Sequence, residues 1–195
     1  MKTLSKTLLC LACMMLMVNC EEENINPTGN ELDPNNVFTA DFTVWDNSVV
    51  PAKEGTSCQL TWEGFGSSVL LGSFSVKITL NCNMSTGEFF DLNGTFIAEE
   101  GSELFFIIRR GIIAPYTGEG CDYYQNCFND QAQITGGTGR FVYVTGSFYP
   151  NAFIHNGNDH DDDKWFAKFV CEGKLVNFDP SGEDLPYYVF SDIIY

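Results

Sequence analysis

The chain of 195 residues is poor in positive charge and in histidine. It has 10 Lys and Arg against 26 Asp and Glu, with only 2 His, so its formal net charge at pH 7 is −16. A protein that binds nucleic acid through the phosphates needs a basic face, which so few cations can scarcely supply. The N-terminal apolar run, Leu8 to Val18, is too short for a membrane-spanning helix, which takes about 20 residues. Because 44% of the residues are hydrophobic, a largely disordered chain is excluded as well.

The N-terminus has the layout of an export signal. Two lysines precede the apolar run, Cys20 follows it, and three glutamates come directly after the cysteine. A basic start and an apolar stretch of this length are typical of a secretory signal peptide. The closing cysteine resembles the acylation site of a bacterial lipoprotein, which implies that Cys20 carries the lipid anchor and that residues 1–19 are removed. An ordinary cleaved signal peptide and an uncleaved anchor are the alternatives.

The segment after the cysteine predicts where the protein is held. Residues 20–36 are polar, acidic and interrupted by proline and glycine, so we expect a flexible tether. Glutamates at 21–23 resemble the signal with which one Gram-negative phylum sends lipoproteins to the outer cell face, whereas in other Gram-negative bacteria such residues retain the protein at the inner membrane. We expect an exported protein, lipid-anchored in the outer membrane and facing the cell exterior.

The rest of the chain, residues 37–195, has the pattern of a single all-β domain. Apolar and β-branched residues alternate with polar ones, and glycine, asparagine, aspartate or proline separates the runs. We find no amphipathic helix outside the signal, which favours an antiparallel sandwich or barrel. The expected strands are 37–45, 57–62, 74–82, 89–98, 104–113, 131–135, 140–149, 164–176 and 187–194.

The most specific motif is a glycine-rich segment, Gly136-Gly137-Thr138-Gly139-Arg140-Phe141, followed by Gly146. It lacks the lysine and the spacing of a phosphate-binding loop. Three glycines in four residues predict a tight turn that leads directly into the next strand. A glycine inside that strand predicts a bulge or a crowded position, and we expect Arg140 to pack or pair locally.

This segment resembles the GGTG-[KR]-F…G signature of the allene oxide cyclase and dirigent barrel superfamily, including its uncharacterised bacterial members. Residues 72–82 look like the second hairpin of that family. Residues 96–104 are similar to its F-x-A-x-x-G-D-x-L segment, with Ser102 in place of the acid. The resemblance covers about residues 56–178 and implies a calycin-like, eight-stranded antiparallel barrel with a central cavity. Such a barrel can be filled by side chains or hold one small ligand. No catalytic residue carries over.

Five cysteines follow Cys20. An exported domain sits in oxidising surroundings, so disulfides are allowed, and Cys121 and Cys127 are the expected pair because a short stretch separates them. At most two of Cys58, Cys82 and Cys171 can pair with each other, and the sequence leaves open which. We expect the remaining thiol to be buried and inert.

Two polar clusters are candidate binding sites. Residues 155–164 gather two histidines and four aspartates and could hold Ca²⁺ or a transition metal, but the spacing of a calcium loop is absent, so we expect a solvated loop. Arg109 and Arg110 are neighbours on one strand and face opposite ways, so one could meet an anionic head group inside a cavity; a salt-bridged position at the rim is the expectation. We predict no metal and no cofactor.

The sequence leaves three functions open. The first is a non-catalytic lipoprotein whose barrel binds a partner or a lipophilic small molecule. The second is an isomerase or cyclase that acts on a lipophilic substrate inside the barrel, and the third is a structural or adhesive coat protein with a filled barrel. The contents of the barrel discriminate among them, because both small-molecule functions need a cavity and an enzyme also needs ionisable groups in it. The oligomeric state is not predicted.

Overall fold

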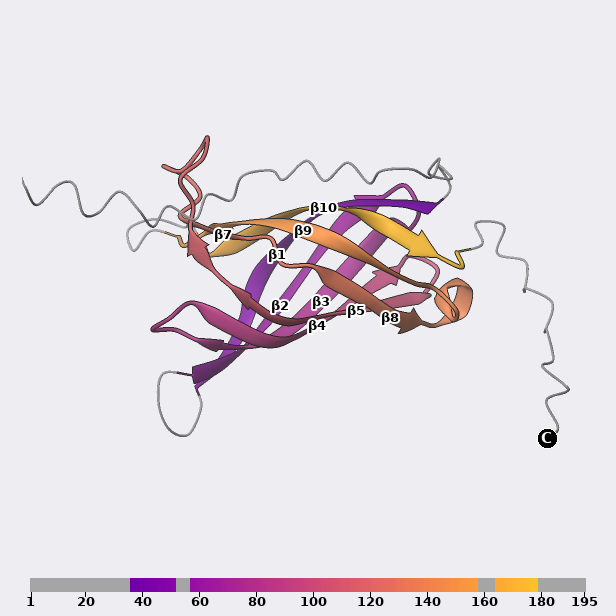
Figure 1. Cartoon of the computed structure of the whole chain (residues 1–195), viewed down its shortest axis with the longest axis horizontal. Helices are drawn as coiled ribbons and strands as arrows, with labels where there is room; N and C mark the ends of the chain where they lie inside the picture. The colour runs from indigo at the N-terminus through magenta and orange to yellow at the C-terminus, as the bar shows by residue number, and fades with distance from the viewer. Residues whose placement is uncertain (1–35, 52–56, 158–163, 179–195) are drawn as a thin grey trace, which may run out of the picture.

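A computed structural model describes residues 36–51, 57–157 and 164–178 (Figure 1). The predicted signal peptide, Cys20, nearly all of the tether and the predicted strand 187–194 lie outside the described residues. Within them the chain forms strands joined mainly by turns, and the last part of the glycine-rich segment, Gly139–Phe141, forms a 3-10 helix. The elements are β1 Val37–Pro51, β2 Ser57–Ser68, β3 Gly72–Asn83, β4 Glu88–Ala98, β5 Glu103–Ile112, β6 Ala114–Pro115, β7 Asn126–Phe128, β8 Ala132–Gly137, η2 Gly139–Phe141, β9 Thr145–His155 and β10 Phe166–Val176.

The strands close into an antiparallel barrel, which confirms the predicted fold class. Eight strands follow one another around the ring in the order β1, β2, β3, β4, β5, β8, β9 and β10. The ring closes where β10 pairs with β9 on one side and with β1 on the other, as in the pairs Phe166 with His155 and Phe42 with Phe169. Every strand of this ring therefore has a neighbour on each side, although the ladder between β5 and β8 spans only Leu104–Ile107 of β5.

Two-residue periodicity explains which side chains face inward. In β3 the buried positions are Phe74, Val76, Ile78, Leu80 and Cys82, the five residues that the sequence places on one face. Successive residues of a strand point to opposite faces, so an alternating sequence buries one complete face when the sheet closes. The other long strands contribute in the same way to one continuous hydrophobic core inside the barrel.

The strand predicted over residues 140–149 is wrong at both ends. Residues 139–141 form η2, and β9 begins at Thr145 and continues to His155. The glycine-rich segment therefore does not lead directly into a strand. The reason is the side chain of Phe141, which is fully buried. The 3-10 turn directs this ring into the core at the end of the barrel, whereas an extended chain would place it outside the core.

The two ends of the barrel are built differently. The loop 116–125 between the short strands β6 and β7 stands out from one end, and η2 lies at the other (Figure 1). Neither β6 nor β7 was predicted, because pieces of two and three residues are too short to show periodicity. Within residues 36–51, 57–157 and 164–178, no helix is long and apolar enough to cross a membrane.

Candidate functional site

The glycine-rich motif lies where three separate connections meet. Gly139 has φ 55°, a left-handed conformation that side chains disfavour, and a Cβ on it would collide with the Ser102 hydroxyl. A Cβ on Gly137 would likewise strike the carbonyl oxygen of Glu103. These two glycines are therefore required because they let η2 approach the turn between β4 and β5. Gly146 also meets the expectation of crowding, since a Cβ there would strike the carbonyl of Lys174 in β10.

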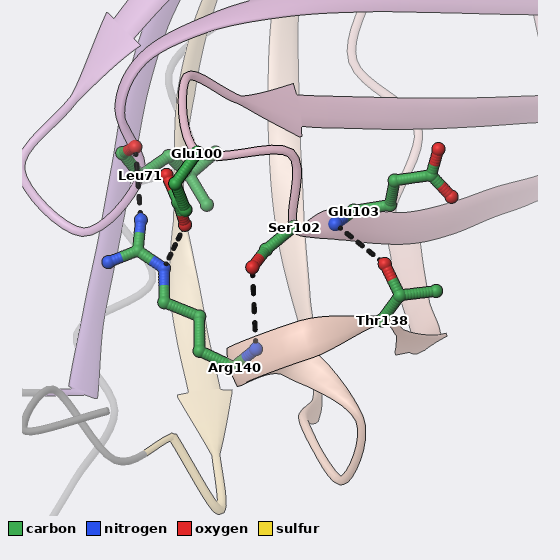
Figure 2. Close-up of polar contacts among 6 residues, drawn as sticks. All are labelled: Leu71, Glu100, Ser102, Glu103, Thr138 and Arg140. Atoms are coloured by element: carbon green, nitrogen blue, oxygen red, sulfur yellow. Dashed lines mark hydrogen bonds and ion pairs between the residues drawn. The ribbon is translucent and has the colours of Figure 1, made fainter. Parts of the chain in front are cut away.

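Arg140 holds these connections together with its guanidinium group, as Figure 2 shows. Its Nε lies 2.8 Å from a carboxylate oxygen of Glu100, in the turn between β4 and β5. Its Nη2 donates a hydrogen bond of 3.2 Å to the carbonyl of Leu71, in the turn between β2 and β3. The guanidinium carbon also lies 4.9 Å from the centre of the Phe141 ring. Arg140 is half-buried and pairs locally, as the sequence analysis expects.

The neighbouring residues reinforce the same junction (Figure 2). The backbone N–H of Arg140 donates to the Ser102 hydroxyl at 3.4 Å. Thr138 and Glu103 exchange two hydrogen bonds: the backbone N–H of Glu103 donates to the Thr138 hydroxyl at 3.0 Å, and the N–H of Thr138 donates to the Glu103 carbonyl at 2.8 Å. We call this group the Arg140 cluster; its members are Leu71, Glu100, Ser102, Glu103, Thr138 and Arg140.

The Arg140 cluster has a structural role. The guanidinium group is already engaged by a carboxylate, a backbone carbonyl and an aromatic ring, so binding an added anion would require breaking these contacts. The bond to the Leu71 carbonyl could not be predicted from the sequence, because any residue type supplies the same backbone acceptor. The motif thus holds together the turns at one end of the barrel.

Phenylalanine rings fill the barrel interior. Phe96 is fully buried and lies at the centre of this group, with ring-centre distances of 5.0 Å to Phe74, 4.8 Å to Phe106 and 5.5 Å to Phe42. Phe42 in turn stacks on Phe169 at 4.4 Å and 8°. Tilted and edge-to-face contacts at these distances are the favoured packing of aromatic rings. The full set in contact is Phe38, Phe42, Phe74, Phe89, Phe96, Phe106, Phe128, Phe148 and Phe169.

The described interior carries almost no polar chemistry. Among the described residues, His155 is the only polar or charged residue whose side chain is buried. It lies at the end of β9, where its Nδ1 is 2.6 Å from the carbonyl oxygen of Tyr123. Its ring packs against Tyr123, at 4.6 Å, and Phe166, at 5.1 Å, and these two rings also contact each other at 5.9 Å. This histidine therefore fastens the loop 116–125 to the barrel.

The other candidate cations and metal ligands are not gathered into a site. Arg109 and Arg110 are both exposed at the end of β5, so neither reaches the interior. Residues 158–163 of the acidic loop lie outside the described residues. Within the described part of the chain, no three His, Cys, Asp or Glu side chains are grouped closely enough to hold a metal ion.

The cysteines are arranged differently from the expectation. Cys121 and Cys127, the expected pair, are not joined by a disulfide: Cys121 is exposed in the loop 116–125, whereas Cys127 is buried in β7. The short strand β7 places Cys127 in the sheet beside Phe153 of β9, whereas Cys121 stays exposed in the loop. Cys58 and Cys82 are also free cysteines, but they face each other on β2 and β3 with their sulfurs 2.7 Å apart, at hydrogen-bond distance.

Cys171 lies away from that pair. Its register partner on β1 is Ala40, near the start of the strand, whereas Cys58 pairs with Pro51 at the end of β1. Its side chain is buried, and burial raises the pKa of the thiol well above its ordinary value. A thiol of this kind is rarely ionised and reacts slowly.

Comparison of the chain with protein-family models, with curated proteins and with solved structures finds no match.

Proposed function

We propose that this protein is an exported lipoprotein, anchored through Cys20 and facing the cell exterior, whose barrel domain acts as a non-catalytic binding module through its outer surface. The export signal, the following cysteine and the acidic tether support the placement. The glycine-rich motif and the eight-stranded ring support membership of the allene oxide cyclase and dirigent barrel superfamily.

The filled interior is the observation that carries the proposal. A pocket for a small molecule is concave, with walls that bury most of the ligand. Here Phe96 and the rings around it occupy the centre of the barrel at contact distance. A ligand at the level of Phe96 would have to displace several rings, which is costly because protein interiors pack as densely as organic crystals. Partners therefore meet the outside of the barrel.

The lack of interior chemistry argues against the isomerase or cyclase alternative. Such an enzyme needs an acid, a base or a polarising donor beside its substrate. Among the described residues the buried polar side chain is His155, and it packs against Tyr123 and Phe166 at the end of β9. A structural or adhesive coat protein remains the second candidate, because it has the same need for a filled and stable barrel.

The outer surface offers apolar side chains for contacts at the end that carries η2. Val69, in the turn between β2 and β3, is 88% exposed, and Tyr143, just after η2, is 62% exposed. The bond from Arg140 to Leu71 holds these two turns against each other. We take these exposed apolar side chains as the part of the outer surface that a partner contacts.

Acyl-chain labelling in the native host tests the anchor. Wild type should incorporate labelled fatty acid, Cys20→Ala should not, and the matched variant Cys10→Ala should label like wild type because residue 10 lies inside the signal. Equal labelling of Cys20→Ala and wild type would overturn the lipid anchor. Protease treatment of intact cells then tests display, since an inaccessible barrel domain would contradict an exterior position.

Native mass spectrometry of the protein extracted from cells tests the filled barrel. We expect the mass of the processed chain with its lipid and no further component. A small molecule retained in stoichiometric amount would overturn the outer-surface proposal and favour the isomerase or cyclase alternative.

A further inference from the structure

The facing cysteines of β2 and β3 form a pair that the sequence left undecided. Cys58 and Cys82 are direct register partners in an antiparallel ladder. Residues directly opposite in such a ladder have Cα atoms about 4.5–5.5 Å apart, which falls inside the range of about 4.4–6.8 Å that a disulfide requires. The backbone therefore already has the spacing for a cross-strand bond.

The side chains agree with the backbone. The two sulfur atoms lie 2.7 Å apart, and both side chains are buried, with 7% of Cys58 and 3% of Cys82 exposed. Both rotamers thus direct their sulfurs at each other inside the barrel. Cys171 is excluded as a competitor because it is placed at the other end of β1 by its pairing with Ala40.

We propose that Cys58 and Cys82 form a disulfide that staples β2 to β3 in the exported protein. The bond rests on the proposed export, since reducing surroundings would keep both thiols reduced. The oxidant is a disulfide reagent, protein or small molecule, of the export compartment. One thiolate attacks a sulfur of that reagent and releases one reagent thiol, and the second thiolate then displaces the other. The two cysteines lose two protons and two electrons, and the reagent's S–S bond accepts the electrons.

The burial of the pair sets the time at which the bond forms. Burial, together with the neighbouring Cys58, raises the pKa of the Cys82 thiol from 9.0 to about 12. The thiolate is the attacking species, so once β2 and β3 have closed the reaction is slow at neutral pH. Because both side chains are buried, we expect oxidation before β2 and β3 close, and we expect a reductant to reach the finished bond slowly.

Peptide mapping of the full chain from native cells tests the bond. Free thiols are blocked with an alkylating reagent in denaturant at lysis, without reductant, and the protein is digested with trypsin. Cleavage after lysine and arginine separates the pair, with Cys58 in peptide 54–77 and Cys82 in peptide 78–109, while Cys171 falls in peptide 169–174. We expect 54–77 linked to 78–109, with the alkyl label on 169–174. Label on both 54–77 and 78–109 would overturn the proposal.

A refolding experiment separates the geometry from the compartment. The reduced full chain is unfolded and refolded with oxidised and reduced glutathione, and the same peptides are mapped. If peptides 54–77 and 78–109 are linked after refolding but carry the alkyl label in the sample from cells, both the bond in the cell and the export on which it rests are overturned. Labelled peptides in both samples, together with lipid on Cys20, would overturn the disulfide while leaving the lipoprotein proposal standing.

Variants supply the matched control. Cys58→Ser should leave 78–109 labelled, and Cys82→Ser should leave 54–77 labelled, whereas Cys171→Ser should leave the link intact. If Cys58→Ser or Cys82→Ser does not fold, the peptide map of the wild-type protein decides the assignment. A link from Cys58 or Cys82 to any other cysteine in wild type would contradict the assignment.

Discussion

The Nη2 atom of Arg140 donates a hydrogen bond to the carbonyl oxygen of Leu71, which lies 69 positions earlier in the chain. The same guanidinium pairs with Glu100, so one side chain joins the β2–β3 turn, the β4–β5 turn and η2. This relationship explains why an arginine follows the glycine-rich segment: its flat, forked group can serve a carboxylate and a carbonyl at once.

We expect Arg140→Ala to lower the free energy of unfolding by about 1–2 kcal/mol, because it breaks one hydrogen bond and a partly exposed ion pair. Arg140→Lys should recover part of the loss, since it keeps the charge but not the fork. Arg110→Ala is the control, because Arg110 is exposed, and should change the value by less than about 0.5 kcal/mol. Urea unfolding measures all three, and equal loss at both arginines would contradict the role assigned to Arg140.

Gly139→Ala should destabilise the protein by about 2–3 kcal/mol. It combines a left-handed backbone with a collision against Ser102. Gly72 is a matched control because its φ of 71° is also left-handed but its Cβ would meet nothing within 4 Å. Gly72→Ala should therefore cost only about 1–2 kcal/mol. Thermal unfolding of the two variants tests this order, and a larger loss at Gly72 would disprove it.

Phe96→Ala should cost about 3–5 kcal/mol, the usual loss for a large aromatic side chain in a core. Phe96 is fully buried among other rings. Phe65→Ala removes the same atoms from a position that is 66% exposed and should cost less than about 1 kcal/mol. Denaturant unfolding compares them. A small effect at Phe96 would show that the interior is loosely filled and would weaken the outer-surface proposal.

The carboxyl group of Asp130 gives a pH-dependent prediction. Burial raises its pKa above 3.8, although the backbone N–H of Ile112 donates to it and acts in the opposite direction. A folded pKa above the unfolded one means that the folded protein binds the proton more tightly. The contribution of Asp130 to stability is therefore largest below pH 3.8 and is lost as the pH rises through the higher folded pKa.

Asp130→Asn should remove that dependence, because the amide oxygen can still accept the bond from Ile112 and carries no charge. The variant should be at least as stable as wild type at pH 7, and the difference should shrink as the pH falls toward 4. Unfolding free energies measured between pH 4 and 7 check this. A variant that loses stability equally at every pH would show that the carboxylate is not penalised in the fold.

The sequence by itself determined the class of fold and the inward face of the strands. Alternation in segments such as residues 74–82 follows from the geometry of an extended chain, in which neighbouring side chains point to opposite sides, so it can be read without knowing the partners. The eight-stranded ring was reached through the resemblance carried by the glycine-rich motif. The first two strands begin where the sequence predicts, at Val37 and Ser57, but they continue well past the predicted ends at 45 and 62, to Pro51 and Ser68. The strand expected at 140–149 began too early, because burying Phe141 required a turn.

The tertiary structure alone decided the contents of the barrel and the pairing of the thiols. Residue type could not distinguish phenylalanines that line a cavity from those that fill it, because both are apolar; only the ring distances around Phe96 do so. Nearness in sequence favoured Cys121 with Cys127, yet the register between β2 and β3 brings Cys58 to Cys82. Register is set by the turn and by burial along whole strands, so it depends on the folded sheet more than on any local pair of residues.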